Sequence, residues 1–304
     1  MFVVNHRKII FTLIGILVVL SLLSFFGWGL HFGIEYTGGS LLEVNYPTGR
    51  PLNTAVDTEL APLNLGAYVL QPTGDTGFIL KTRFLTEPEH NAVLGALSQN
   101  GKVTIEQKNF NSIGPVIGGE LKRKAIIAIV LVILCIVLFI AFAFRKVSEP
   151  VSSWKYGVVA IITLIHDIAI PAGMYGFLVH FHGAQIDILF TTALLAVLGI
   201  SINDTIVVFD RIRENLRLNK EGRGKEPFDQ IVGRSLKQTY LRSFNTSFTV
   251  ILVLFSLFLL GGETTKNFAL TLLVGMIAGT YSSIFLASPL LVAWNNHQQK
   301  KLSR

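Results

Sequence analysis

The segment Ser201-Ile202-Asn203-Asp204-Thr205-Ile206-Val207-Val208-Phe209 decides the fold class, because it places an acidic residue inside a long apolar run. That run, about 186–209, is long enough to cross the hydrocarbon core of a bilayer, which takes about 20 helical residues. A carboxylate inside the core costs on the order of 3 kcal/mol. Asp204 is therefore the first candidate for a functional residue.

The composition of the whole chain agrees with a membrane protein. Of the 304 residues, 51% are hydrophobic and only 15% are charged, and the mean hydropathy is +0.55. Soluble domains are near a quarter charged, so an ordinary soluble protein, a disordered chain and a nucleic-acid-binding domain are excluded. The single cysteine, Cys135, leaves no intrachain disulfide and no cysteine metal site. We expect no cofactor and no metal.

Six segments have the length and hydropathy of membrane spans, and the basic residues orient them. Nine lysines and arginines lie between 211 and 242, whereas the short loops on the opposite side hold only Lys266. The positive-inside rule then places both termini in the cytoplasm. No A-x-A cleavage pattern follows the first span, which we expect to be an uncleaved anchor. The predicted spans are about 9–30, 125–144, 156–178, 186–209, 244–262 and 267–294.

The chain thus divides into an N-terminal segment with the first span (1–30), an extracytoplasmic domain (31–124) and a five-helix membrane region (125–304). The domain shows the order β-α-β-β-α-β, which is the ferredoxin-like split unit. Its strands are expected at 40–46, 65–71, 77–83 and 102–110, and its helices at 53–60 and from Thr86 to about 98, with a Thr86–Glu89 capping box. In the cytoplasmic loop 210–242, Gly222 and Gly224 predict two short amphipathic helices at the membrane surface.

Several acidic residues lie in or beside the spans, and each has a structural alternative. Asp187 and Asp210 are most simply interfacial, and Asp167, beside His166, is either a buried hydrogen-bonding group or part of a polar path. Asp204 has Ser201 one turn before it and Asn203 beside it. A buried carboxyl balanced between desolvation and a nearby cation can load and release a proton. Arg242, which enters the next span from the same side, is the candidate cation.

Small residues in the last span predict a close helix contact. Gly275 and Gly279 have the G-x-x-x-G spacing that lets two helix backbones approach. The motif is common, and packing is the interpretation that we adopt.

Several strings share the motifs of one known family. These are Gly33-Ile34-Glu35-Tyr36-Thr37-Gly38-Gly39, Ile113-Gly114-Pro115-Val116-Ile117-Gly118, the run from Ser201 through Asp210 and Arg211 to Asn215, and Gln238-Thr239-Tyr240-Leu241-Arg242-Ser243. They resemble the signatures G-I-D-F-T-G-G and V-G-P-x-V-G, the fourth-span motif, and Q-T-x-x-R-T/S of SecF, the smaller half of the SecD–SecF protein-export pair. Glu35 and Tyr36 are conservative departures from that pattern.

The resemblance implies one half of a resistance-nodulation-division-type transporter, with six of twelve spans, in the bacterial cytoplasmic (inner) membrane. It implies that the chain is no enzyme, that SecD is its partner, and that it associates with SecYEG, YajC and the translocating preprotein. The pair would use the proton motive force to assist late-stage translocation, with Na⁺ as the alternative to H⁺. Within that family the residues that correspond to Asp204 and Arg242 are implicated in proton passage. Asn203 and Asp167 are expected to tune or line the same path.

Two other functions stay open. A proton-coupled exporter of small molecules has the same superfamily architecture, although such exporters usually carry both halves in one chain. An intramembrane aspartyl protease could use Asp167 and Asp204, since paired carboxyls can activate water. That class typically has glycine directly before one aspartate, whereas Asn203 stands there. No P-loop, H-E-x-x-H or G-x-S-x-G motif is present.

Overall fold

A computed structural model describes residues 3, 6–143, 151–222 and 226–302. The chain forms two compact units. One holds residues 31–127 together with 185–188, and the other holds 1–30, 128–184 and 189–304. We call the first of these the outer unit, because it holds the domain predicted at 31–124. It is not one continuous segment, since residues 185–187 and Ile188, the first residue of the fourth long helix, join that domain.

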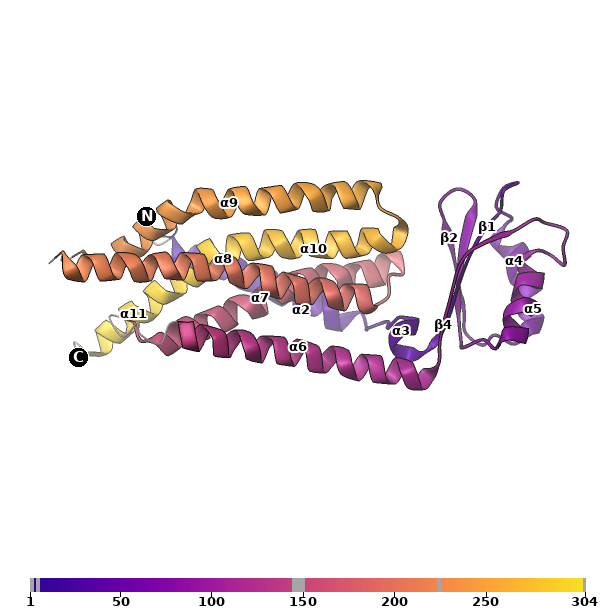
Figure 1. Ribbon diagram of the computed structural model, residues 1–304, viewed down its shortest axis with the longest axis horizontal. Coiled ribbons are helices and arrows are strands. Elements are labelled where there is room, and N and C mark those ends of the chain that lie inside the picture. The colour runs from indigo at the N-terminus through magenta and orange to yellow at the C-terminus, as the bar shows by residue number, and fades with distance from the viewer. Residues whose placement is uncertain (1–2, 4–5, 144–150, 223–225, 303–304) are drawn as a thin grey trace. The chain divides into compact units, whose positions relative to one another are not determined.

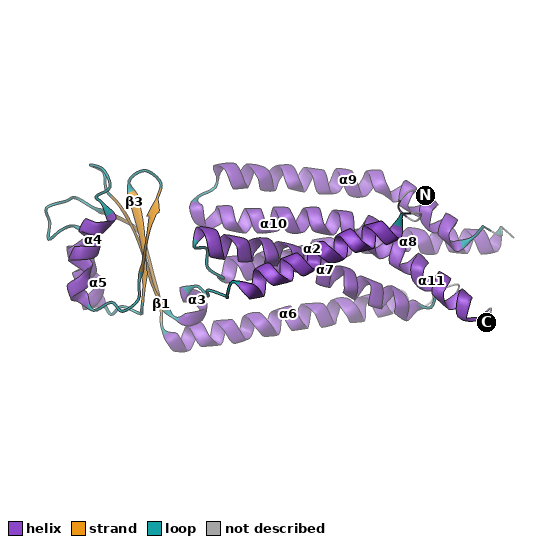
Figure 2. Cartoon of the chain, turned by 180° about the vertical axis from the view of Figure 1, so that it is seen from behind, coloured by secondary structure: helices purple, strands orange, loops and turns teal. Residues whose placement is uncertain are grey.

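The outer unit is a four-stranded sheet with α4 (Asn53–Leu60) and α5 (Glu87–Leu97) on one face (Figure 2). The strand order is β2-β3-β1-β4, and each neighbouring pair is antiparallel. Leu42, Val44 and Tyr46 alternate into the core, as the period of a half-buried strand requires. The elements are α3 (Ile34–Thr37), β1 (Gly39–Asn45), α4 (Asn53–Leu60), η1 (Ala61–Leu63), β2 (Val69–Thr73), β3 (Gly77–Thr82), α5 (Glu87–Leu97) and β4 (Glu106–Ile113).

Two predicted strands in this unit are shifted along the chain. The predicted strand 65–71 is β2 at Val69–Thr73, and the predicted strand 102–110 is β4 at Glu106–Ile113. Leu65 and Ile105 still pack in the core, but from connecting segments. An apolar residue in the sequence indicates burial but not whether its backbone pairs with another strand. The apolar pattern therefore predicted the ends of β2 and β4 at the wrong residues. The capping box between Thr86 and Glu89 is present at the start of α5.

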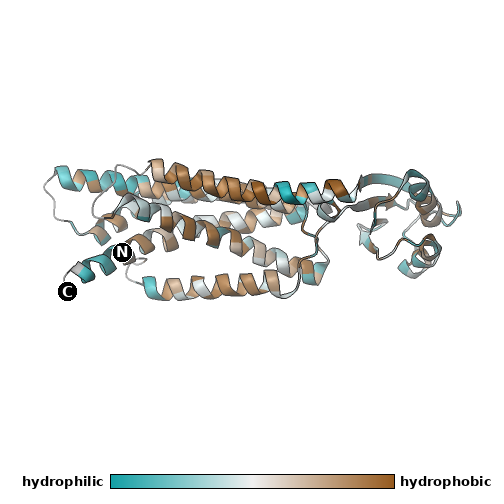
Figure 3. Cartoon of the chain, turned by 90° about the horizontal axis from the view of Figure 1, so that it is seen from below, coloured by the Kyte–Doolittle hydropathy of each residue, from teal (hydrophilic) through white to brown (hydrophobic). Residues whose placement is uncertain are grey.

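Six helices are long and apolar enough to cross a membrane, among the residues that the structure describes. In Figure 1 the start of α2 and the end of α11 lie at the same end of the bundle. Figure 3 shows hydrophobic residues along the length of these helices and hydrophilic residues near the marked termini. Their bounds are α2 (Arg7–Gly27), α6 (Pro115–Ala143), α7 (Ser153–His182), α8 (Ile188–Glu221), α9 (Phe228–Leu260), and α10 (Glu263–Ser282) continued by η2 (Ser283–Ala287) and α11 (Ser288–Leu302).

The prediction of two short surface helices in 210–242 is wrong. Instead, α8 runs on to Glu221 and α9 already begins at Phe228, so the connection shrinks to a few residues. Ile212 on α8 and Phe228 and Val232 on α9 are buried in one apolar cluster, which holds the extensions together as a helical hairpin. Basic residues that predicted a surface loop are exposed on the faces of this hairpin, among them Arg213, Arg217, Arg234 and Lys237. Arg223 and Lys225 lie outside the described residues. Of the predicted glycine breaks, Gly222 follows the end of α8, and Gly224 lies outside the described residues.

The other span predictions differ from the structure mainly at their ends. Helix α6 begins at Pro115, ten residues before the predicted 125–144; Phe144 lies outside the described residues. The last span is not one regular helix, because η2 is a five-residue π-helical segment between α10 and α11. The hydrophobic windows of α7 and α8 are 67% and 56% buried, whereas those of α2 and α6 are 6% buried. The window of the last span, which begins in α10, is 61% buried. Helices α7, α8 and α10 therefore form the interior of the bundle in this chain.

Candidate functional site

Asp204 lies on the buried face of α8. Its side chain is 6% exposed, and its Oδ2 atom accepts a hydrogen bond of 3.3 Å from the Ser247 hydroxyl on α9. Phe209 and Val208, one turn further along α8, pack into the apolar cluster and fix the rotation of the helix. The carboxyl is thus held inside the bundle, where an unpaired charge is costly.

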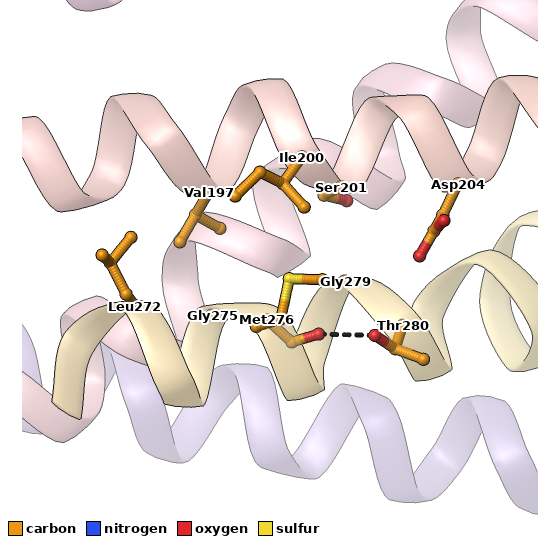
Figure 4. A pocket seen from close by; sticks show the side chains of 9 residues that line it. All are labelled: Val197, Ile200, Ser201, Asp204, Leu272, Gly275, Met276, Gly279 and Thr280. Atoms are coloured by element: carbon orange, nitrogen blue, oxygen red, sulfur yellow. Dashed lines mark hydrogen bonds between the residues drawn. The ribbon is translucent and has the colours of Figure 1, made fainter. Parts of the chain in front are cut away.

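A small pocket borders Asp204 between α8 and α10. In Figure 4 the Asp204 carboxyl points from α8 toward α10, with Ser201 one turn away on the same wall. The cavity volume is about 10 Å³, which is room for about one water molecule. Its lining comes from α8 and α10 alone: Val197, Ile200, Ser201, Asp204, Leu272, Gly275, Met276, Gly279 and Thr280.

The two glycines of the last span bring α10 close to α8. A methyl group built on Gly279 would lie 2.8 Å from Cβ of Ser201, and one built on Gly275 would overlap the side chain of Val197. Any larger residue would therefore separate the helices beside Asp204. The structure places the G-x-x-x-G face where the two helices form the pocket.

Asp167 belongs to a chain of hydrogen-bonded side chains that crosses three helices. His166 Nδ1 lies 2.7 Å from Asp167 Oδ1, and the Ser201 hydroxyl donates to Asp167 Oδ2. On the other side, the Tyr281 hydroxyl lies 2.7 Å from His166 Nε2. His166 and Asp167 are 3% and 0% exposed. Ser201 therefore contacts Asp167 while it also lines the pocket of Asp204.

Two predicted path residues lie elsewhere. Asn203 is on the exposed face of α8, turned away from the neighbouring Asp204. Arg242 is also exposed, and within the described residues no ion pair joins it to Asp204. Its charge still acts on that carboxyl, but the direct contact is made by Ser247. The structure thus brings together Asp204, Ser201 and Asp167, and leaves Asn203 and Arg242 on outer surfaces of this chain.

The acidic and basic residues in the last part of the fourth-span motif pair within their own helix. Asp210 contacts Arg213 at 2.6 Å, and Arg211 contacts Glu214 at 2.6 Å, in each case at the surface. Asn215 is different, because it is 3% exposed and donates hydrogen bonds of 2.8 Å to both Ser235 and Gln238 on α9. Asn215 therefore joins the extensions of α8 and α9 that form the helical hairpin.

The two glycine motifs meet inside the outer unit. Gly38 has φ of 76°, and a methyl group on it would lie 2.6 Å from Cα of Pro115; one on Gly118 would lie 2.6 Å from the Gly38 nitrogen. The Thr37 hydroxyl donates to the Gly33 carbonyl at 3.0 Å and closes the short helix α3. These contacts hold the start of β1 against the start of α6, so the motif residues Gly33, Thr37, Gly38 and Gly39 are structural in this chain.

Asp187 lies in the short segment, residues 185–188, that joins the outer unit. The Gly33 nitrogen donates to the Ile186 carbonyl at 2.8 Å, which draws this loop onto the segment before α3. Glu35 and Asp187 lie near Lys81 on β3 and act on its charge. Burial lowers the pKa of Lys81, and the two carboxylates partly oppose that shift.

Sequence reasoning missed two of the contacts around the acidic residues, those made by Tyr281 and Ser247. Tyr281 lies in a run of small polar residues that suggested packing only, and its link to His166 depends on how α7 and α10 cross. Ser247 could have been found from its spacing: Ser235, Thr239, Ser243 and Ser247 recur every four residues and all lie on the buried face of α9. No group of three or more potential metal ligands occurs in the described part of the chain.

Comparison with known proteins identifies the family. The family described as "Protein export membrane protein SecD/SecF, C-terminal" matches residues 93–297, which include both buried aspartates and the whole pocket. The chain belongs to the SecD/SecF protein-export family. This is the family expected from the motifs, and the chain is accordingly a multi-pass membrane protein of protein export.

Individual members of the SecD/SecF family match along most of this chain. Protein translocase subunit SecF of Thermobaculum terrenum is 38% identical over 314 residues, which cover 99% of this chain and 96% of that protein. SecF of Anaerolinea thermophila is 34% identical and covers 97% and 94% of the two chains. Protein translocase subunit SecDF of Thermus thermophilus is 34% identical over 90% of this chain and 36% of its own.

A solved structure of the family has the same fold. The crystal structure of SecDF, described as a translocon-associated membrane protein, from Thermus thermophilus matches 96% of this chain at 32% identity with a TM-score of 0.82. This chain spans 38% of the length of that SecDF chain.

Proposed function

We propose that this chain is the SecF-type subunit of a protein-export complex, and that it uses the proton motive force to assist late-stage translocation of preproteins. The partner subunit is of the SecD type, because the SecDF relative joins a matching segment to a longer chain. The complex associates with SecYEG and YajC. The proposed location is the bacterial cytoplasmic membrane with both termini in the cytoplasm, where the basic hairpin of α8 and α9 would also lie.

In this proposal the outer unit has the ferredoxin-like arrangement, which the sheet order β2-β3-β1-β4 supports. It contacts the emerging preprotein and changes orientation as the bundle cycles. The chain itself performs no covalent chemistry. One elementary charge that moves through 100 mV supplies about 2.3 kcal/mol, and this free energy biases the packing of helices around the site.

The observation that carries the proposal is the environment of Asp204. The carboxyl is buried, has one hydroxyl donor in Ser247, and borders a pocket with room for about one water. Arg242 is near enough to act on its charge without an ion pair in the described chain. A carboxyl held this way can exist with or without a proton, whereas a tight ion pair would keep it charged. H⁺ is the proposed coupling ion, and Na⁺ is the alternative.

The proposal is tested by preprotein translocation into inverted membrane vesicles that contain the complex, with and without an imposed proton motive force. Asp204→Asn should insert and assemble but lose the stimulation by the proton motive force, and Arg242→Ala should behave alike. Asp210→Asn is the matched control, since Asp210 is exposed and pairs with Arg213. Full stimulation in Asp204→Asn would refute the proposal.

A small-molecule exporter is the second candidate. It would share the pocket beside Asp204 but would not need preprotein. Export of dyes or drugs by the complex, with no effect on translocation, would favour it. An intramembrane protease that uses Asp167 and Asp204 is the remaining alternative. It would require that the purified protein cleave a substrate and that Asp204→Ala abolish the cleavage.

A further inference from the structure

His166 and Asp167 form a second buried group of titratable side chains in the bundle. Asp167 is fully buried in α7, and a lone carboxylate at such a place costs several kcal/mol. The proposed role of Asp204 assigns no step to this second carboxyl, which the sequence placed along the same path. Asp167 must therefore be compensated by a partner or carry a proton.

The titratable groups around this pair are few. His166 contacts Asp167, Tyr281 on α10 contacts His166, and α8 adds Asp204 beyond Ser201. Helix α2 from 9 to 27 and the segment η2 contain no titratable residue. One proton bound to the pair, as a carboxylic acid or an imidazolium, removes the uncompensated charge.

The hydrogen-bond pattern lets a proton arrive without a rearrangement of heavy atoms. In the neutral ring, Nδ1–H of His166 donates to Asp167 Oδ1, and Nε2 accepts from the Tyr281 hydroxyl. This leaves Asp167 Oδ2, which accepts from Ser201, as the atom open to a proton. Tyr281 directly precedes Ser282 and the π-helical segment η2, and such segments occur frequently at functional sites.

Ser201 connects this chain of hydrogen bonds to Asp204. It precedes Asp204 by three residues on α8, so the two side chains lie on one helix face. Both line the pocket that has room for about one water. A water there would complete a continuous file of exchangeable hydrogens from Asp204 to Tyr281.

We propose that the His166–Asp167 pair is a second proton-binding site of the bundle, and that it exchanges its proton with Asp204 through the Ser201 hydroxyl and one water. This inference rests on the proposed proton-coupled function. In the transfer, Asp204 gives its proton to the water, the water gives one to Ser201 Oγ, and Ser201 gives its own to Asp167 Oδ2. Water and serine end neutral with their hydrogen bonds reversed, and one proton has moved from Asp204 to the pair.

The test measures both equilibrium protonation and transfer rate in the reconstituted complex of the full chain with its partner subunit. Infrared spectroscopy against pH follows the carboxyl bands, which Asp167→Asn and Asp204→Asn assign. A pH-sensitive dye inside the vesicles reports proton flux after a pH jump. Ser201→Ala is the central variant because alanine keeps Cβ, which packs against Gly279, and removes only the hydroxyl.

We expect the variants to affect the infrared titration and the proton flux differently. Ser201→Ala lowers the proton flux by about tenfold or more, while the Asp167 band still titrates. His166→Gln and Tyr281→Phe shift the pH at which that band titrates and leave the Asp204 band unchanged. Ser282→Ala is the control, since this buried hydroxyl donates to the Gly279 carbonyl of its own helix; it should match the wild type in both.

Two results would overturn the inference: an Asp167 band that does not change with pH in the wild type, or wild-type flux in Ser201→Ala. Either can occur while Asp204→Asn still abolishes flux, and then only the second site is refuted. If the wild-type complex passes no protons at all, the proposed function fails first.

Discussion

The contact between α10 and α8 yields the sharpest quantitative prediction. In Gly275→Ala the new methyl group overlaps the side chain of Val197, which is 2% exposed. Overpacking of this kind costs about 1–3 kcal/mol. Alanine also favours a helix over glycine by about 1 kcal/mol. The net change in the free energy of unfolding is therefore a loss of about 0–2 kcal/mol.

A second glycine-to-alanine variant isolates the contribution of overpacking, because it has the same gain in helix propensity without the overlap. Gly199 lies on α8, and a methyl group added to it would meet no atom within 4 Å, so Gly199→Ala gains the helix propensity alone. The two variants should differ by about 1–3 kcal/mol, a factor of roughly 5–150 in the folded-to-unfolded ratio. Reversible unfolding in mixed micelles measures both. Val197→Ala should rescue Gly275→Ala in a double-mutant cycle. Equal stability of the two glycine variants would refute the close approach of α8 and α10.

Four further predictions test other parts of the chain. Hydrogen bonds from Arg83 and from Thr86 lower the pKa of Glu89 from 4.5 to about 2. The stability that they give α5 is present above pH 4.5 and is lost as the pH falls toward 2. Glu89→Gln should therefore make the hydrogen-exchange protection of α5 less dependent on pH in this range. Asn215→Ala removes both bonds to α9 and should lower protection of the first turns of α9 by about 1–3 kcal/mol, whereas Asn219→Ala, with a single bond of 3.4 Å to Glu226, should have little effect. Ser243 Oγ is buried without a hydrogen bond in the described chain, so Ser243→Ala should be neutral or stabilise by up to about 1–3 kcal/mol, and a loss of stability in micelle unfolding would contradict this. Gly38→Ala should destabilise the outer unit more than Gly49→Ala, because both glycines have positive φ but only Gly38 abuts Pro115; thermal unfolding compares them.

The sequence alone predicts the elements that depend on local patterns. Six apolar runs give six candidate spans, and Thr86 with Glu89 gives the start of α5, because both signals are carried within a few residues of the feature. The length of α8 and α9 was not predictable in this way. Ile212 and Val232 are buried only because the two helices pair, and a loop rich in basic residues hides that pairing.

In the candidate site, too, some residues can be identified from a local sequence pattern and others only from the packing of helices. Asp204 and Asp167 stand out because an acid in an apolar run is costly wherever the helix lies. Asn203 was chosen as a neighbour of Asp204 in sequence, but adjacent residues point to different sides of a helix. The contacts of Tyr281 and Ser247 join helices that are far apart in sequence, so only the three-dimensional arrangement reveals them.

The central claim is that Asp204 binds and releases the proton that drives export. The most direct measurement is proton flux through vesicles that contain the complex, after a pH gradient is imposed, for the wild type and for Asp204→Asn. We predict flux in the wild type and none above protein-free vesicles in the variant, with Asp210→Asn like the wild type. Undiminished flux in Asp204→Asn would contradict the account.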